Sequence, residues 1–413
     1  MSTVAVLNLP EYGHMNATFP LIAELVARGE RVVYYSTERF RAAVEAAGAE
    51  FAGYGNDSAF EPPAHTGGLY SVMEYLMGLA EDLLPGLLQR LRDDLPDYLL
   101  IDSMCVWGGL AQQILKLPAT ALASVFVPNP ALVSMEEMVD QAYSQAPKEV
   151  ILAGIGALNT YLKIAQRIDR RFGTRSPNMV EFFAGRQPLN ILFTSRHFHP
   201  AGDRYDESYQ FVGPSMASRI RAQGVPFTLP DGDHPLIYIS LGTIFSDRPE
   251  FYRACFDAFG GGPYSVVVAT GTRIDPQTLG SVPANFIVRD YVPQLEVLER
   301  ASLFLTHGGM NSASEALWHG VPLLVYPQHG DQHLVAARVS ELGAGLRLSN
   351  GDIKPVRLRQ LADRVLAEPA FRKQGRKIAE GFHAAGGCRR AAGEILAYSR
   401  NTAPGIAACP QFA

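Results

Sequence analysis

Short apolar runs alternate with helical patterns along this chain, and the alternation starts twice. In the first half the runs that we predict as strands are 4–9, 31–36, 99–102, 119–124 and 190–195. In the second half they are 236–240, 265–269, 286–288, 303–306, 322–326 and 345–348. Strands separated by helices indicate βαβ units and parallel sheets. We therefore expect an α/β fold with two doubly wound sheets.

The alternation breaks once, between Gly213 and Pro235, in a segment rich in Gly, Pro and polar residues. Such composition is typical of a linker between domains. We predict a first Rossmann-like domain over residues 1–213, a linker over 214–234 and a second Rossmann-like domain over 235–385. Longer helical patterns lie between the strands of the first half, at 71–91, 104–115 and 148–172.

Composition excludes several classes of protein. With 413 residues, 47% of them hydrophobic, the chain can build two cores and is not disordered. A net charge of −5 lacks the basic footprint of a nucleic-acid partner. The 4 Cys are scattered without a C-x-x-C pair, and the start lacks a basic region before its short apolar run. With no apolar run of about 18 residues, we expect a cytoplasmic protein without a membrane span.

Two polar residues follow strands of the first half. His14 stands after the first strand at the head of a helix, and Asp102 closes the strand 99–102. Neutral imidazole suits a general base near neutral pH, and a carboxylate on its other nitrogen would fix the ring's tautomer. The alternatives are a polar turn for His14 and a helix N-cap for Asp102.

A glycine turn in the second half connects the strand 303–306 to a helix. His307, Gly308 and Gly309 are followed by Asn311 and Ser312 at the helix start. Glycines permit close approach of a ligand, and a helix start with its N–H groups favours an anion. The pattern predicts a phosphate cradle without a Walker lysine. Glu315, one turn further, could accept both hydroxyls of a ribose.

Three shorter segments add groups at strand ends. Asp331 and Gln332 open the helix after 322–326 and suit sugar hydroxyls, while Tyr291, Val292 and Gln294 offer a flat face and polar groups for a nucleobase. Gly242 and Thr243, after 236–240, would supply amides and a hydroxyl to a second phosphate.

A metal site is the alternative interpretation of the same region, because His329, Asp331 and His333 alternate. At a helix start they would not share one face, so we predict no metal. The pair Asp231 and Asp233 lies in the linker and is typical of a turn. Neither a G-x-G-x-x-G nor a G-x-x-x-x-G-K-[ST] motif occurs, which argues against a dehydrogenase and a P-loop enzyme.

Together these motifs resemble the family 1 glycosyltransferases, which glycosylate small molecules with UDP-sugars, and in particular their bacterial macrolide branch. His307 and Asp331 lie 24 positions apart, as in the donor-binding box of that family. The resemblance implies a GT-B fold, in which two Rossmann-like domains face each other across a cleft. It also implies that residues 386–413, with a helix over 388–398, pack back on the first domain.

The same resemblance implies roles for single residues. His14 would be the catalytic base, with Asp102 as its orienting partner. The residues that would bind the donor are Gly242, Thr243, Tyr291, Val292, Gln294, His307, Gly309, Asn311, Ser312, Glu315, Asp331 and Gln332. Within this set, Tyr291 would stack on uracil, Glu315 would bind the ribose, and Asp331 with Gln332 would hold the hexose.

The residues that would bind the acceptor are the ones that the sequence indicates least clearly. Residues suited to an adaptable apolar pocket are Phe60, Met73, Met77, Phe126 and Met138, and ordinary core packing is the alternative for each.

We therefore expect an inverting hexosyltransferase that uses UDP-glucose, needs no cofactor, and acts on a hydroxyl of an apolar molecule such as a macrolide, polyphenol or terpenoid. We expect a monomer or homodimer. The alternatives are an epimerase, a lipid-intermediate or TDP-deoxysugar transferase, and a non-catalytic nucleotide-sugar-binding protein. The last would not need both His14 and Asp102.

Overall fold

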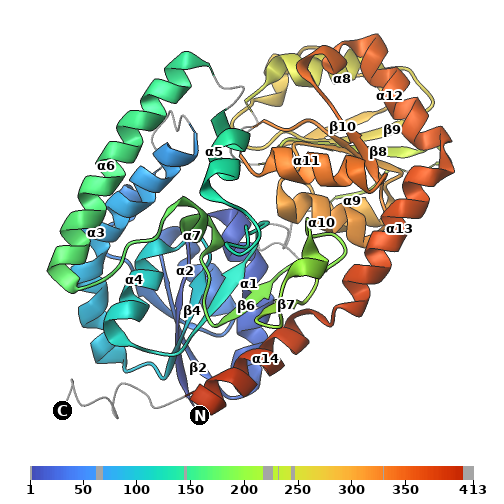
Figure 1. The fold of residues 1–413 in the computed structure, drawn as a ribbon. Coiled ribbons are helices and arrows are strands. Elements are labelled where there is room, and N and C mark those ends of the chain that lie inside the picture. The colour runs from blue at the N-terminus through green and yellow to red at the C-terminus, as the bar shows by residue number, and fades with distance from the viewer. Residues whose placement is uncertain are drawn as a thin grey trace. The chain divides into compact units, whose positions relative to one another are not determined.

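The computed structural model describes residues 2–61, 68–143, 147–216, 227–230, 232–242, 247–328 and 330–402, apart from the side chains of residues 141 and 142. The chain forms two compact α/β units (Figure 1). The first comprises Met1–Phe193, Asp203–Ser215 and Gly386–Ala413, and the second comprises Thr194–Gly202 and Met216–Ala385.

The first unit contains a seven-stranded parallel sheet in the order β3-β2-β1-β4-β5-β6-β7. Its strands are β1 Thr3–Leu7, β2 Arg31–Ser36, β3 Glu50–Gly53, β4 Tyr98–Asp102, β5 Ala119–Ala123, β6 Leu189–Leu192 and β7 Tyr209–Phe211. Its helices are α1 Tyr12–Ala27, α2 Arg41–Ala46, α3 Leu69–Asp94, α4 Val106–Leu115, α5 Met135–Tyr143, α6 Lys148–Phe172, α7 Met179–Ala184 and α14 Gly387–Thr402.

The second unit contains a six-stranded parallel sheet in the order β10-β9-β8-β11-β12-β13. Its strands are β8 Leu236–Ser240, β9 Ser265–Ala269, β10 Phe286–Arg289, β11 Leu303–Thr306, β12 Leu323–Val325 and β13 Gly345–Arg347. Its helices are α8 Pro249–Phe259, α9 Gln294–Arg300, α10 Met310–Trp318, α11 Gln332–Glu341, α12 Pro355–Ala367 and α13 Pro369–Ala384.

The two faces of β1 belong to two different hydrophobic cores. Ala5 and Leu7 pack in the core formed with α3, α4 and α6, whereas Val4 and Val6 pack in the core formed with α1 and α14. Successive side chains of a strand point to opposite faces, so one apolar run supplies both cores. The C-terminal helix α14 contributes Ala391 and Ile395 and so belongs to the first unit.

Among the strands and α-helices, the sequence did not predict β3, β7, α5, α7, α12 and α13. β3 and β7 are the edge strands of the first sheet and span only 4 and 3 residues. Runs this short carry little periodicity, and their pairing with β2 and β6 is a tertiary effect. None of the helices in the described part of the chain is long and apolar enough to cross a membrane.

His199 lies in the segment Thr194–Gly202 and is buried, with 1% of its surface exposed. Its Nδ1 lies 2.8 Å from the carbonyl oxygen of Pro200. Burial, together with the positive charge of Arg338, lowers the pKa of His199 to about 4. The imidazole is therefore neutral in the folded protein over most of the pH range.

This burial predicts acid-sensitive stability. Above the unfolded-state pKa of about 6.5 His199 is neutral in both states, whereas between that value and about 4 only the unfolded chain gains the proton. The free energy of unfolding should fall over this window, by about 3 kcal/mol from His199 alone. Urea unfolding at a series of pH values should show a smaller loss in His199→Gln. The exposed His234 supplies the control His234→Gln, and the same pH slope in all three proteins would contradict the prediction.

Candidate active site

The strand order of the first sheet reverses between β1 and β4. In open parallel sheets, ligands bind beyond the carboxyl ends of the strands at such a switch point. His14 is the third residue of α1, which follows β1, and Asp102 is the last residue of β4. The two predicted catalytic residues therefore lie at the position that this sheet topology favours for a ligand.

The structure brings the side chains of His14 and Asp102 together. His14 Nδ1 lies 2.8 Å from Asp102 Oδ2, and their side chains are 14% and 1% exposed. The second oxygen, Oδ1, accepts a hydrogen bond of 2.9 Å from the backbone N–H of Met104. Ser124, just after β5, places its hydroxyl 3.4 Å from the same His14 nitrogen.

This geometry determines what the imidazole can do. A carboxylate accepts hydrogen bonds, so Asp102 selects the neutral tautomer with the proton on Nδ1. The lone pair is then on Nε2, where it can accept a proton from a hydroxyl. The proposed N-cap role of Asp102 is only partly right, because α4 begins at Val106 with Cys105 as its N-cap residue.

A buried polar network anchors the start of α1, and sequence reasoning missed it. Asn8 donates to the hydroxyl of Tyr34 at 2.6 Å, and Thr18 lies 2.7 Å from that hydroxyl. The hydroxyl of Thr18 in turn donates to the carbonyl of Met15, next to His14. Burial raises the pKa of Tyr34, so its hydroxyl stays protonated. The only sequence signal was an asparagine at the end of an apolar strand.

The second sheet reverses its strand order between β8 and β11. Gly242 follows β8 and His307 follows β11, so the predicted phosphate-binding residues also lie at a switch point. Asn311 and Ser312 are in the first turn of α10, where N–H groups lack helical partners. Thr243, which would add a hydroxyl here, lies outside the described residues.

The ring of His307 lies between two glycines. A Cβ on Gly242 would be 2.7 Å from His307 Cε1, and a Cβ on Gly309 would be 2.5 Å from His307 Nε2. On Gly308, which has a φ of +85°, a Cβ would be 2.4 Å from a Val325 methyl carbon. All three glycines are therefore required for the ring and the turn to occupy these places.

Gln294 makes hydrogen bonds within the second unit through both atoms of its side-chain amide. Its Oε1 accepts a hydrogen bond of 3.0 Å from the Tyr238 hydroxyl, and its Nε2 donates to Glu315 Oε2 at 2.5 Å and lies 3.4 Å from Ser312 Oγ. Gln294 and Glu315 are both buried. Gln294 therefore holds the carboxylate of Glu315 in place, and its own contact with a nucleoside stays a prediction.

Asp331 and Gln332 lie at the start of α11. Asp331 is the N-cap residue but makes no side-chain capping hydrogen bond. Gln332 Oε1 accepts from the backbone N–H of Gln328 at 2.8 Å, so it also holds the preceding loop. The carbonyl oxygen of Gln332 would be 3.4 Å from a Cβ on Gly308, which places α11 beside the glycine turn.

The burial of the remaining predicted residues does not distinguish a binding role from ordinary packing. Tyr291 is half-buried and Val292 is buried, just before α9. Phe60, Met73 and Met77 lie in the core of the first unit with 4%, 1% and 0% of their surface exposed, and core packing is enough to explain them. Phe126 is buried and Met138 is half-buried. Contact of these five residues with an acceptor stays a prediction.

The predicted absence of a metal site is not settled by the structure. Among the described residues, no group of three or more His, Cys, Asp or Glu side chains could hold a metal ion. His329, one member of the alternative trio, lies outside those residues.

Comparison with known proteins assigns the chain to a family. A profile described as the C-terminal domain of the erythromycin biosynthesis protein CIII-like family matches residues 259–395. The NDP-glycosyltransferase YjiC of Bacillus subtilis is 34% identical over 406 residues, which cover 97% of this chain and 98% of the relative. The chain belongs to the family 1 glycosyltransferases.

Two further glycosyltransferases, both of bacterial natural-product type, are similar to this chain over nearly its whole length. The oleandomycin glycosyltransferase of Streptomyces antibioticus is 30% identical over 95% of this chain and 90% of its own. The solved structure of CalG4, the calicheamicin glycosyltransferase, has a TM-score of 0.81 at 28% identity and covers 98% of this chain and 100% of that chain. The predicted GT-B fold and the bacterial natural-product type of this glycosyltransferase are thereby confirmed.

The hydrogen bond to Asp102 predicts a fixed tautomer for His14. Nitrogen-15 NMR of the neutral ring should show the proton on Nδ1, because Asp102 Oδ2 lies 2.8 Å from that nitrogen. In Asp102→Ala the preference for this tautomer should be lost. A neutral ring in the wild-type protein with its proton on Nε2 would contradict the geometry.

Proposed function

We propose that this glycosyltransferase transfers a hexose, glucose in our assignment, from a UDP-sugar to a hydroxyl of an apolar small molecule, with inversion at the anomeric carbon. The observation that carries the proposal is the 2.8 Å contact between His14 Nδ1 and Asp102 Oδ2 at the switch point of the first sheet. A buried carboxylate paired with a half-buried histidine is the usual arrangement of a general base.

In the proposed reaction, His14 Nε2 removes the proton of the acceptor hydroxyl while its oxygen attacks the anomeric carbon. The bond from that carbon to the diphosphate oxygen breaks, and its electron pair leaves with UDP. Asp102 stabilises the imidazolium that forms. General-base assistance of this kind is worth about 10²–10⁴ in rate.

The second sheet would hold the donor. The first turn of α10, with Asn311 and Ser312, offers N–H groups and the positive end of a helix dipole to the diphosphate. His307 and Thr243 would add hydrogen bonds to the same charge. The buried Glu315, held by Gln294, suits the ribose hydroxyls. Asp331 and Gln332 would bind the hexose.

The choice of substrates is supported by the residues and by the relatives' names. The relative from Bacillus subtilis is named for nucleoside-diphosphate donors, and the one from Streptomyces antibioticus for oleandomycin, a macrolide. An apolar natural product with a free hydroxyl is therefore our proposed acceptor class. UDP-glucose with a panel of polyketide, flavonoid and terpenoid aglycones, read by mass spectrometry, tests both choices. Product formed only with a TDP-deoxysugar would overturn the donor assignment.

Removal of the base should separate chemistry from binding. His14→Ala should lower kcat by at least about 100-fold, because the acceptor hydroxyl loses its proton acceptor, while UDP affinity measured by calorimetry stays unchanged. His234→Ala, at an exposed site, is the matched control. Full activity of His14→Ala would refute the assignment of the base.

Removal of the Glu315 charge should act on binding instead. Glu315→Gln should weaken UDP binding by about tenfold, since a hydrogen bond to a charged group contributes about 1.5–3 kcal/mol. The fold should survive, because Gln keeps the shape of the side chain beside Gln294. Calorimetry with UDP, and with UMP lacking one phosphate, checks this, and unchanged affinity for both nucleotides would remove Glu315 from the donor site.

A further inference from the structure

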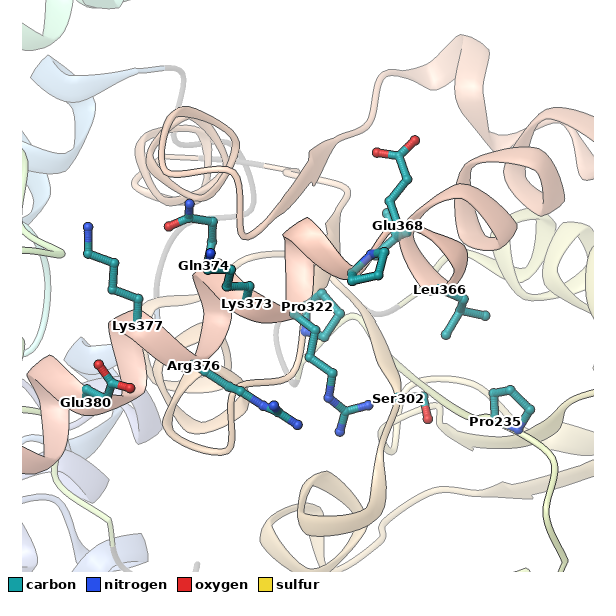
Figure 2. Close-up of a pocket in the computed structure, with 13 residues that line it drawn as sticks. Pro235, Ser302, Pro322, Leu366, Glu368, Lys373, Gln374, Arg376, Lys377 and Glu380 are labelled. Carbon is teal, nitrogen blue, oxygen red and sulfur yellow. The ribbon is translucent and has the colours of Figure 1, made fainter.

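A hollow of about 960 Å³ lies within the second unit, at the edge of its sheet that the donor-binding residues do not use (Figure 2). Pro235, Ser302 and Pro322, which line it, each immediately precede a strand. The proposed donor-binding residues follow the carboxyl ends of the same strands, with Gly242 after β8, His307 after β11 and Asp331 after β12. The hollow therefore lies at the amino ends and is separate from the proposed donor site.

The α13 side of the hollow is basic. Arg372, Lys373, Arg376 and Lys377 all line it and are exposed. None of the four forms an ion pair within the described part of the chain. Figure 2 shows Arg376 extending from α13 toward the side of the hollow bordered by Ser302.

Several helical arginines of the chain pair with a carboxylate one turn away, as in Arg28–Glu24, Arg364–Glu368 and Arg390–Glu394. On α13 Arg372 and Arg376 are four residues apart, as are Lys373 and Lys377. Carboxylates occur at the same spacing, Glu368 before Arg372 and Glu380 after Arg376, but Glu368 pairs with Arg364 and Glu380 forms no ion pair in the described part of the chain. Like charges at this spacing destabilise a helix, and cations in its first turns oppose the helix dipole.

An anion in the hollow would reverse both costs. It would neutralise the repulsion between the four cations and interact favourably with the N-terminal half of α13. Guanidinium groups bind phosphate through two parallel hydrogen bonds. Two arginines on one face of a helix therefore suit a phosphate ligand.

The rest of the lining is partly apolar, and it also contains Gln374 and the carboxylates of Glu368, which pairs with Arg364, and Glu380. Pro235, Pro322 and Pro369 give rigid walls, and Val365 with Leu366 adds apolar surface. A hollow of this volume is large enough for a small molecule.

We propose that this hollow binds a phosphorylated small molecule through Arg372 and Arg376, with Lys373 and Lys377 adding charge. The site is distinct from the donor site and does not depend on the proposed function.

Pyrophosphate is the probe that tests this. Its dissociation constant is measured by calorimetry at low ionic strength with saturating UDP present, so that a donor phosphate site is occupied. Arg372→Gln/Arg376→Gln should weaken binding at least tenfold. Arg41→Gln/Arg357→Gln removes the same charge from two ion-paired arginines and should bind like the wild type.

A second readout separates ligand binding from structural damage. Without pyrophosphate, Arg372→Gln/Arg376→Gln should unfold at the same or a higher temperature than the wild type, because a repulsive pair is removed. Equal pyrophosphate affinity in all three proteins, or equal weakening in both variants, would overturn the proposal. Equally tight binding of an oligoglutamate peptide per unit charge would also overturn it, in favour of an acidic protein partner.

Discussion

The parallel pairing of β1 with β4 is the constraint on which the candidate active site depends. In this register Leu7 lies opposite Ile101, so Asp102 and the residues that follow Leu7 emerge at the same edge of the sheet. A slip of two residues would move one strand by about 6.6 Å along the other. The 2.8 Å contact between His14 and Asp102 could not survive such a shift. The apolar residues of both strands thus fix the geometry of a polar pair.

The burial of Asp102 shows how the fold tolerates this pair. A carboxylate without hydrogen bonds in an apolar environment would cost several kcal/mol. Here one oxygen accepts from the Met104 N–H and the other contacts His14. The second unit uses the same solution, since the buried Glu315 is held by Gln294, which Tyr238 orients. In both units the charged residue is stabilised by a partner that follows a different strand of the same sheet.

The sequence predicted the features that depend on local pattern. The alternation of strands and helices was enough for two parallel sheets. Polar residues at the strand ends made Asp102 a candidate partner of His14, and the resemblance to the glycosyltransferases implied that pairing. Features that depend on distant contacts could not be predicted. Gly242 must lack a side chain because of His307, which is remote in sequence. Apolar character alone could not separate core packing from pocket lining at Met73 and Met77, which the structure buries in the core.

The central claim is that His14 acts as the base toward the acceptor, and an acceptor that needs no base tests it most directly. Transfer by His14→Ala is compared between a phenol and the matching aryl thiol, at a pH where the thiol is already ionised. We predict that transfer to the phenol falls at least about 100-fold while transfer to the thiolate stays within about tenfold of the wild type. An equal loss with both acceptors would contradict the account, because it would show that His14 acts on binding or structure rather than on the proton.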